Sequence, residues 1–163
     1  MSQTITISST LSKEEKYKSL LPQIRSLVEG ENDIIANLGN ICSALKYNMA
    51  DYFWAGIYLK KGDELVLGPF QGTVACTRIK IPQGVCGTSV KERKTIIVND
   101  VSTFPGHIAC SAESKSEIAV PIFKNNEVVA ILDVDSDKYS SFDDTDKLYL
   151  EKLSQFISEL ITS

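Results

Sequence analysis

The sequence predicts an α+β fold, with a central, mostly antiparallel sheet and with N- and C-terminal helices packed on one face. Three observations lead to this prediction. Both ends of the chain carry apolar residues at helical spacing, the middle carries short runs of β-branched and aromatic residues, and turn residues separate these runs. The length of 163 residues suits one domain, expected over 1–163.

The first third of the chain predicts two helices. Ser12 is the expected N-cap of the first, and Glu15 three residues later completes a capping box. Apolar residues recur every three to four positions over 17–28, where Pro22 is expected to kink or break the helix. A second amphipathic helix is expected at 33–47.

The remainder predicts a sheet followed by a final helix. Lys124-Asn125-Asn126 is a hairpin turn between the last two strands, and an apolar stripe over 148–160 predicts the C-terminal helix. The loop over 99–116 is long enough to indicate a functional segment. Strands are expected, in order, at 52–59, 64–67, 78–81, 95–98, 117–123 and 127–135, with a short helix at 84–91 before the fourth.

Composition excludes several classes of protein. The net charge of −4 gives no basic surface for nucleic acid. No apolar run approaches the roughly 18 residues of a membrane span, and the N-terminus lacks the pattern of a signal peptide. A cytoplasmic location is therefore expected, where thiols are kept reduced and only transient, catalytic disulfides are usual.

The cysteines carry the first indication of chemistry. No two of them form a CxxC pair, so no metal site is expected. Cys42 lies on an apolar helix face and is expected to be buried. Cys86 is expected at a helix N-terminus, which would lower its pKa, although a buried residue at a tight turn is equally consistent. Cys76 and Cys110 lie in expected loops. His107 could assist ionisation of Cys110, or it could simply order the backbone of the loop. A Cys–His hydrolase would lack a third residue to orient the histidine.

Acidic residues are expected to gather near Cys110. Asp133 and Asp135 alternate along a strand and share one sheet face, either as interacting carboxylates or as a solvated strand end. Counting eight residues in each direction from Asn125 places Glu117 opposite Asp133. The other, core face of the same strand is expected to carry Val128, Ala130, Leu132 and Val134.

Two aromatic residues share one face of the first strand. Trp54, Gly56 and Tyr58 alternate along it, and the glycine could leave a pocket between the two rings. Ordinary aromatic packing explains the same pattern equally well.

Together these residues resemble a known family. Gly106-His107-Ile108-Ala109-Cys110, Ser116-Glu117-Ile118 and Leu132-Asp133-Val134-Asp135-Ser136 are similar to the free methionine-(R)-sulfoxide reductases, which are single GAF-domain enzymes. The resemblance extends to Trp54-Ala55-Gly56-Ile57-Tyr58, Ala75-Cys76-Thr77-Arg78-Ile79 and Gly84-Val85-Cys86-Gly87-Thr88. It covers most of 51–146 and implies a GAF-like fold.

The resemblance also implies roles for the thiols. Cys110 resembles the catalytic cysteine that attacks the sulfoxide sulfur. Cys86 resembles the resolving cysteine that closes a disulfide with it, and Cys76 resembles a third cysteine that takes part in disulfide exchange. Either Cys86 or Cys76 could therefore convert the Cys110 sulfenic acid to a disulfide, with Cys86 the preferred candidate. The family acts without a cofactor and is recycled by an external dithiol, thioredoxin, and its GAF domains often form homodimers through their terminal helices.

The substrate-binding residues follow from the same resemblance. Glu117, Asp133 and Asp135 match the carboxylates that bind the amino group and the sulfoxide region of free methionine sulfoxide, and Glu117 and Asp135 are the candidate proton donors. Trp54 and Tyr58 match the aromatic wall around the methyl sulfoxide. One departure from the family pattern is Ser111, where an acidic residue is expected.

Two other functions compete with this hypothesis. A GAF sensor would bind a small molecule or report redox state without turnover, and the lack of an output domain in the sequence argues against it. A cysteine peroxidase would turn over peroxide instead of sulfoxide.

Overall fold

Helices and strands follow the predicted order, α-α-β-β-β-α-β-β-β-α. The computed structural model describes residues 4–162, so residues 1–3 and 163 of the expected domain lie outside the described part. Its helices are α1 (Lys13–Leu27), α2 (Ile34–Asn48), α3 (Gly84–Glu92) and α4 (Asp144–Leu160). Its strands are β1 (Trp54–Lys61), β2 (Glu64–Gln71), β3 (Arg78–Lys80), β4 (Ile96–Val98), β5 (Ser116–Lys124) and β6 (Glu127–Ser136).

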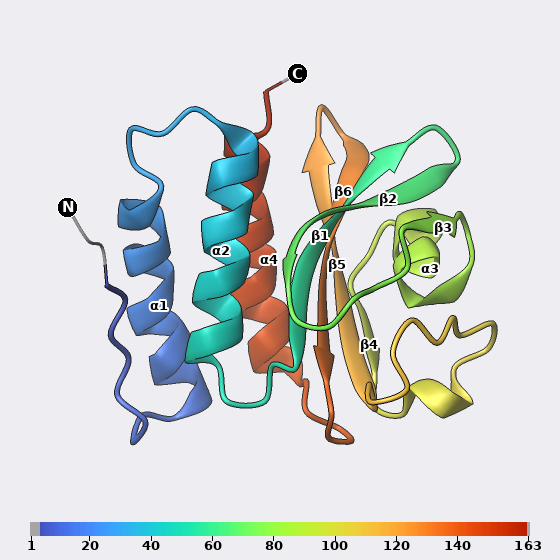
Figure 1. Ribbon diagram of the computed structural model, residues 1–163, viewed down its shortest axis with the longest axis horizontal. Helices are drawn as coiled ribbons and strands as arrows, with labels where there is room; N and C mark the ends of the chain where they lie inside the picture. Colours follow the sequence, from blue (N-terminus) through green and yellow to red (C-terminus); the bar gives the residue numbers. More distant parts are fainter. Residues whose placement is uncertain (1–3, 163) are drawn as a thin grey trace.

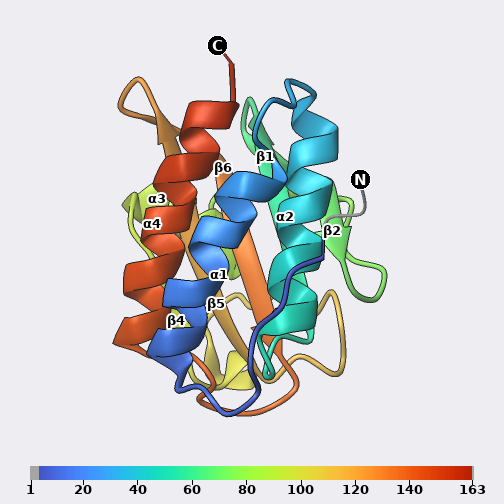
Figure 2. The same cartoon turned by 90° about the vertical axis from the view of Figure 1, so that its left-hand side faces the viewer.

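The strands form one sheet in the order β3-β2-β1-β6-β5-β4, and every pairing is antiparallel. Helices α2 and α4 cover one face of the sheet, with α1 outside them, while α3 and the long loops lie on the other face (Figure 1, Figure 2). The predicted fold class is therefore confirmed. None of the helices within residues 4–162 combines the length and the apolarity that a membrane crossing requires.

Local signals explain how the outer helix starts and continues. The capping box is present, since the Ser12 side chain accepts from the Glu15 N–H and the Glu15 carboxylate accepts from the Ser12 N–H. Of the kink or break expected at Pro22, the break is wrong, because α1 continues to Leu27. The buried side chains on either side of the proline, such as Leu20 and Ile24, hold the helix on the core.

Each face of the sheet has its own core. The larger core lies under the helices and includes fully buried Ile57, Ile118 and Leu132. The smaller core lies under α3 and the loops and includes Trp54 and Tyr58. The candidate site lies on this second face, where the sheet is covered by loops and one short helix.

A one-residue bulge sets the register of the β5–β6 hairpin. Ile122 pairs with Ala130, whereas Phe123 pairs with Val128, which leaves Val129 as the extra residue. Val128 therefore lies in the smaller core, and its prediction for the helix-side core face is wrong.

The same bulge changes the expected partner of Glu117. Glu117 pairs with Asp135 instead of Asp133. Without the bulge, the two-residue turn would pair Glu117 with Val134, whose side chain points to the opposite face. The bulge therefore brings Glu117, Asp133 and Asp135 onto one face.

Candidate active site

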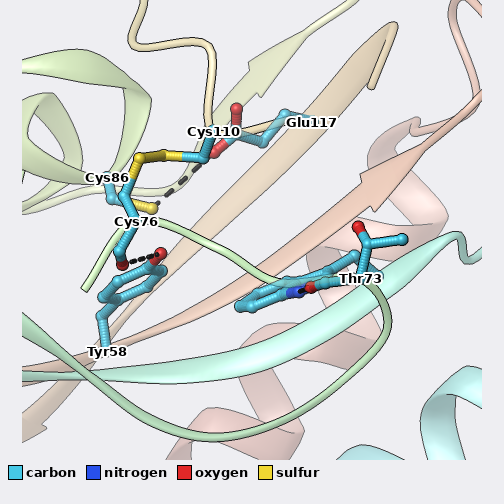
Figure 3. The surroundings of a disulfide bond; sticks show 7 residues. Tyr58, Thr73, Cys76, Cys86, Cys110 and Glu117 are labelled. Carbon is cyan, nitrogen blue, oxygen red and sulfur yellow. Dashed lines mark hydrogen bonds between the residues drawn. A yellow bond between two sulfur atoms is a disulfide. The ribbon is translucent and has the colours of Figure 1, made fainter. Parts of the chain in front are cut away.

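A disulfide joins two of the three cysteines that the sequence singled out. Cys76 and Cys110 are bridged with their Cα atoms 5.2 Å apart (Figure 3). Cys76 lies between β2 and β3, and Cys110 lies in the long loop before β5. The expectation that Cys86 closes the disulfide with Cys110 is wrong for this oxidised state, because the Cys86 thiol is free and buried.

Cys86 lies in the first turn of α3 and faces the carboxylates. Its S–H donates to Oε1 of Glu117, with Sγ and Oε1 3.7 Å apart (Figure 3). Burial, together with the negative charges of Asp133, Glu117 and Asp135, raises the pKa of the Cys86 thiol well above its ordinary value. The expected lowering of this pKa is therefore wrong, since a helix N-terminus contributes only about 1 kcal/mol and cannot offset desolvation next to three acidic groups.

The three carboxylates converge on one patch, in which Glu117 and Asp133 are buried and Asp135 is half-buried. Glu117 and Asp133 are only 6% and 5% exposed, which excludes a solvated strand end. Burial, then repulsion from neighbouring carboxylates, raises the pKa of Glu117 and of Asp135 well above the ordinary range. Burial raises the pKa of Asp133 to about 6. The cluster therefore retains protons near neutral pH, so it can supply both an acid and a negative charge.

Two contacts complete the polar part of this patch. The Ser114 hydroxyl donates to Oδ1 of Asp135 over 2.5 Å. Oδ1 of Asp133 is buried and has no hydrogen-bond partner within residues 4–162. A buried oxygen without a partner loses about 1 to 3 kcal/mol of solvation, so this atom marks the place of a ligand that donates hydrogen bonds or carries positive charge.

Trp54 and Tyr58 form an aromatic wall and also hold the loop that carries Cys76. The Trp54 Nε1–H donates to the carbonyl of Thr73, and the Tyr58 hydroxyl donates to the carbonyl of Cys76, both over 3.0 Å. The indole lies over Gly56, where a Cβ atom would come within 2.3 Å of it. Gly56 therefore makes room for the Trp54 ring itself, instead of leaving an open space between two rings.

A cavity of about 50 Å³ connects these groups. Every predicted site residue except Cys76 lines it, and Cys76 is attached to it through the disulfide. Eight further lining residues were not predicted for the site, since they come together only on folding: Phe53, Val74, Ala75, Ile79, Gly84, Val85, Ile108 and Ser114. Of these, Ser114 had a usable signal, because it lies two residues before the strand of Glu117.

His107 and Ser111 also line the cavity. Partial burial lowers the pKa of His107, and within residues 4–162 no side-chain hydrogen bond joins it to Cys110. The Ser111 hydroxyl accepts from the Glu113 N–H. Cys42 is fully buried in the helix-side core as predicted, and burial raises its pKa to about 12.

Known proteins share both the fold and the sequence of this chain. The sequence profile of the GAF domain matches residues 32–162. The chain is 43% identical to the free methionine-R-sulfoxide reductase of Saccharomyces cerevisiae, over 95% of this chain and 91% of the relative. It is 39% identical to the enzyme of the same name from Escherichia coli, over 94% of this chain and 93% of the relative.

Solved structures of proteins with the same name are similar to this chain in both fold and sequence. A free methionine-R-sulfoxide reductase from Neisseria meningitidis, solved in complex with its substrate, superposes with a TM-score of 0.94 at 43% identity, over 98% of this chain and 95% of that one. A substrate complex of fRMsr from Staphylococcus aureus superposes with a TM-score of 0.84 at 44% identity, over 98% of this chain and 99% of that one.

Proposed function

Because this chain belongs to the GAF domain family and to the free methionine-R-sulfoxide reductases within it, we propose that it reduces free L-methionine (R)-sulfoxide to methionine with thiols. One observation carries the proposal: a disulfide that includes Cys110 lies beside a buried, partly protonated carboxylate cluster. The disulfide supplies the redox couple, and the cluster supplies recognition and protons.

The first chemical step takes place at Cys110. Its thiolate attacks the sulfoxide sulfur, and a protonated carboxyl of Glu117 or Asp135 donates to the sulfoxide oxygen. The sulfoxide loses its oxygen and leaves as methionine, while the Cys110 sulfur gains that oxygen as sulfenic acid. The raised pKa of Glu117 and of Asp135 supports this role, because a donor must still hold its proton near neutral pH.

We assign the second step to Cys76. Its thiol attacks the sulfenic acid of Cys110, which forms the disulfide and releases water. The observed pairing supports Cys76 over Cys86, and so does the raised pKa of Cys86, since the thiolate is the nucleophile. Thioredoxin is the proposed dithiol that then reduces the disulfide by exchange.

The carboxylates explain a preference for a free amino acid. A free amino group is a cation at neutral pH and can donate to the unpartnered Oδ1 of Asp133, whereas a peptide bond removes this charge. Trp54 and Tyr58 supply the apolar wall for the methyl sulfoxide end. No resident cofactor is required by these steps, and a cytoplasmic, thioredoxin-containing environment suits them.

The test is NADPH oxidation coupled through thioredoxin and its reductase, with free methionine (R)-sulfoxide as substrate. N-acetylmethionine (R)-sulfoxide is the matched control, because it keeps the sulfoxide and loses the amino charge. We expect turnover of the free amino acid and little of the acetylated one. Peroxide turnover without sulfoxide turnover would instead indicate a peroxidase.

Two serine variants test the assignment of thiols. Cys76→Ser should release one methionine per protein in a single turnover and then stop, with one added oxygen on Cys110 by mass spectrometry. Cys86→Ser should still form the Cys76–Cys110 disulfide after substrate is added. A Cys76→Ser protein that turns over normally with thioredoxin would contradict the assignment.

A further inference from the structure

Three buried side chains that line the cavity bring a thiol and two carboxylates together. The Sγ of Cys86 and one carboxylate oxygen each of Glu117 and Asp133 all lie within 4.8 Å of one another. They lie on α3, β5 and β6, so no single local sequence motif contains all three. A metal site was not expected from the sequence, which has no CxxC pair.

The spacing of these donors fits a tetrahedral metal ion. Zinc bonds of about 2.3 Å to sulfur and about 2.1 Å to oxygen, at the tetrahedral angle, place the two ligand atoms about 3.6 Å apart. The Sγ of Cys86 and Oε1 of Glu117 are 3.7 Å apart. These two groups therefore need almost no movement to share one ion.

A separate observation indicates that Asp133 has room for a ligand. All three side chains are more than nine-tenths buried, yet Oδ1 of Asp133 has no hydrogen-bond partner among residues 4–162. Within the described part of the chain, no lysine or arginine lines the cavity. The patch therefore concentrates acidic groups without a protein cation to neutralise them.

We propose that Cys86, Glu117 and Asp133 form a site for a divalent transition metal of the zinc class, and that the bound metal excludes the substrate amino group from the same carboxylates. The regulatory half of this inference rests on the proposed function, whereas metal binding itself does not. A thiolate with two carboxylates and one open position favours Zn²⁺ or Co²⁺ over Mg²⁺ or Ca²⁺, which prefer oxygen ligands alone.

The site is independent of the catalytic disulfide. Cys86 keeps a free thiol when Cys76 and Cys110 are bridged. The oxidised protein can therefore bind the metal, and its two free thiols are Cys86 and Cys42. This separates the proposed site from any site made by the Cys76–Cys110 dithiol of the reduced enzyme.

The direct experiment is titration of the oxidised, full-length protein with Co²⁺, without added thiol reductant. Thiolate coordination produces a sulfur-to-cobalt absorption band. We expect this band in the wild type, its loss in Cys86→Ser and its retention in the matched control Cys42→Ser. Mg²⁺ in excess should leave the band unchanged.

Three results would overturn the proposal: no band in the wild type, a band that survives in Cys86→Ser, or a band lost equally in Cys42→Ser. Glu117→Gln keeps the thiol and serves as a second variant, in case Cys86→Ser does not fold. Loss of even an outer-shell partner of a metal lowers the affinity by about tenfold or more. The affinity of Glu117→Gln for Co²⁺ should therefore fall at least about tenfold. Unchanged affinity would count against the site.

A competition experiment tests the regulatory half. Free methionine carries the amino group but no sulfoxide, and it also chelates Co²⁺ in solution, so the comparison is made at equal free Co²⁺ concentration. Under this condition methionine should weaken Co²⁺ binding to the oxidised wild type, and N-acetylmethionine should not. If the cobalt band forms and methionine has no effect, the metal site stands and the exclusion of the substrate amino group is wrong. If NADPH-coupled turnover is absent while the band forms, only the proposed function fails.

Discussion

Asp133→Asn should stabilise the protein at alkaline pH, although it removes a proposed substrate-binding group. Burial raises the pKa of Asp133 from its ordinary value of 3.8 to about 6. Between these two values the folded protein binds more protons than the unfolded chain. The free energy of unfolding therefore falls as the pH rises through this window, and it stays lower above it.

The size of the effect follows from the pKa difference. A difference of about 2.2 pH units is worth about 3 kcal/mol, since each pH unit corresponds to about 1.4 kcal/mol. Asparagine removes this charge while keeping the shape of the side chain, but its amide needs hydrogen-bond partners of its own. We therefore expect the free energy of unfolding to rise by about 1 to 3 kcal/mol at about pH 8.

The assay is urea unfolding of the oxidised proteins at about pH 8 and about pH 4, with the denaturant slope checked for constancy. The gain should shrink at about pH 4, where folded Asp133 is already protonated. Asp137→Asn makes the same chemical change at an exposed position and should alter stability by less than about 0.5 kcal/mol. An Asp133→Asn protein that gains nothing at about pH 8, or gains equally at both pH values, would refute the reasoning.

Three further predictions follow from other contacts. Gly56→Ala places a Cβ atom within 2.3 Å of the Trp54 ring, so the ring must move. The fluorescence emission maximum of this single tryptophan should shift, and the KM for sulfoxide should rise. Unchanged emission would contradict the close contact. Tyr17→Phe removes a 2.5 Å hydrogen bond to buried Asp146. Urea unfolding should show a free energy of unfolding that is lower by about 1 to 3 kcal/mol. A decrease of less than about 0.5 kcal/mol would contradict this prediction. The pKa of Asp133 is about 6. One pH unit below this value, the KM for free methionine sulfoxide should be about tenfold higher than well above it, because Asp133 has lost the charge that holds the amino group. A KM that does not change with pH would assign that charge to another residue.

The order of helices and strands was predictable because it depends on local periodicity. Apolar spacing in the terminal helices and turn residues such as Asn125-Asn126 act over a few residues, and both were interpreted correctly. Pro22 was the exception, since burial of neighbouring side chains outweighed a local helix breaker. Propensity is a weak guide where tertiary packing decides.

Most residues predicted for the site line one cavity, whereas the contacts between them were harder to predict. The pairing of Glu117 depended on an extra residue, Val129, that no turn pattern reveals. The choice between Cys76 and Cys86 as disulfide partner depended on how two loops meet over the sheet. The pKa of Cys86 depended on carboxylates that are distant in sequence, so a rule based on the helix N-terminus alone gave the wrong direction.

The hydrogen bonds from Trp54 and Tyr58 to the backbone of the Cys76 loop limit how this enzyme could evolve. The two rings proposed to contact the sulfoxide each donate a hydrogen bond to a carbonyl of the segment that carries Cys76. A mutation that enlarges the wall for a bulkier substrate therefore also loosens the segment on which regeneration depends. Changes in substrate range should accordingly arise as paired substitutions in β1 and 72–77, and single substitutions in the wall should trade selectivity against the number of turnovers.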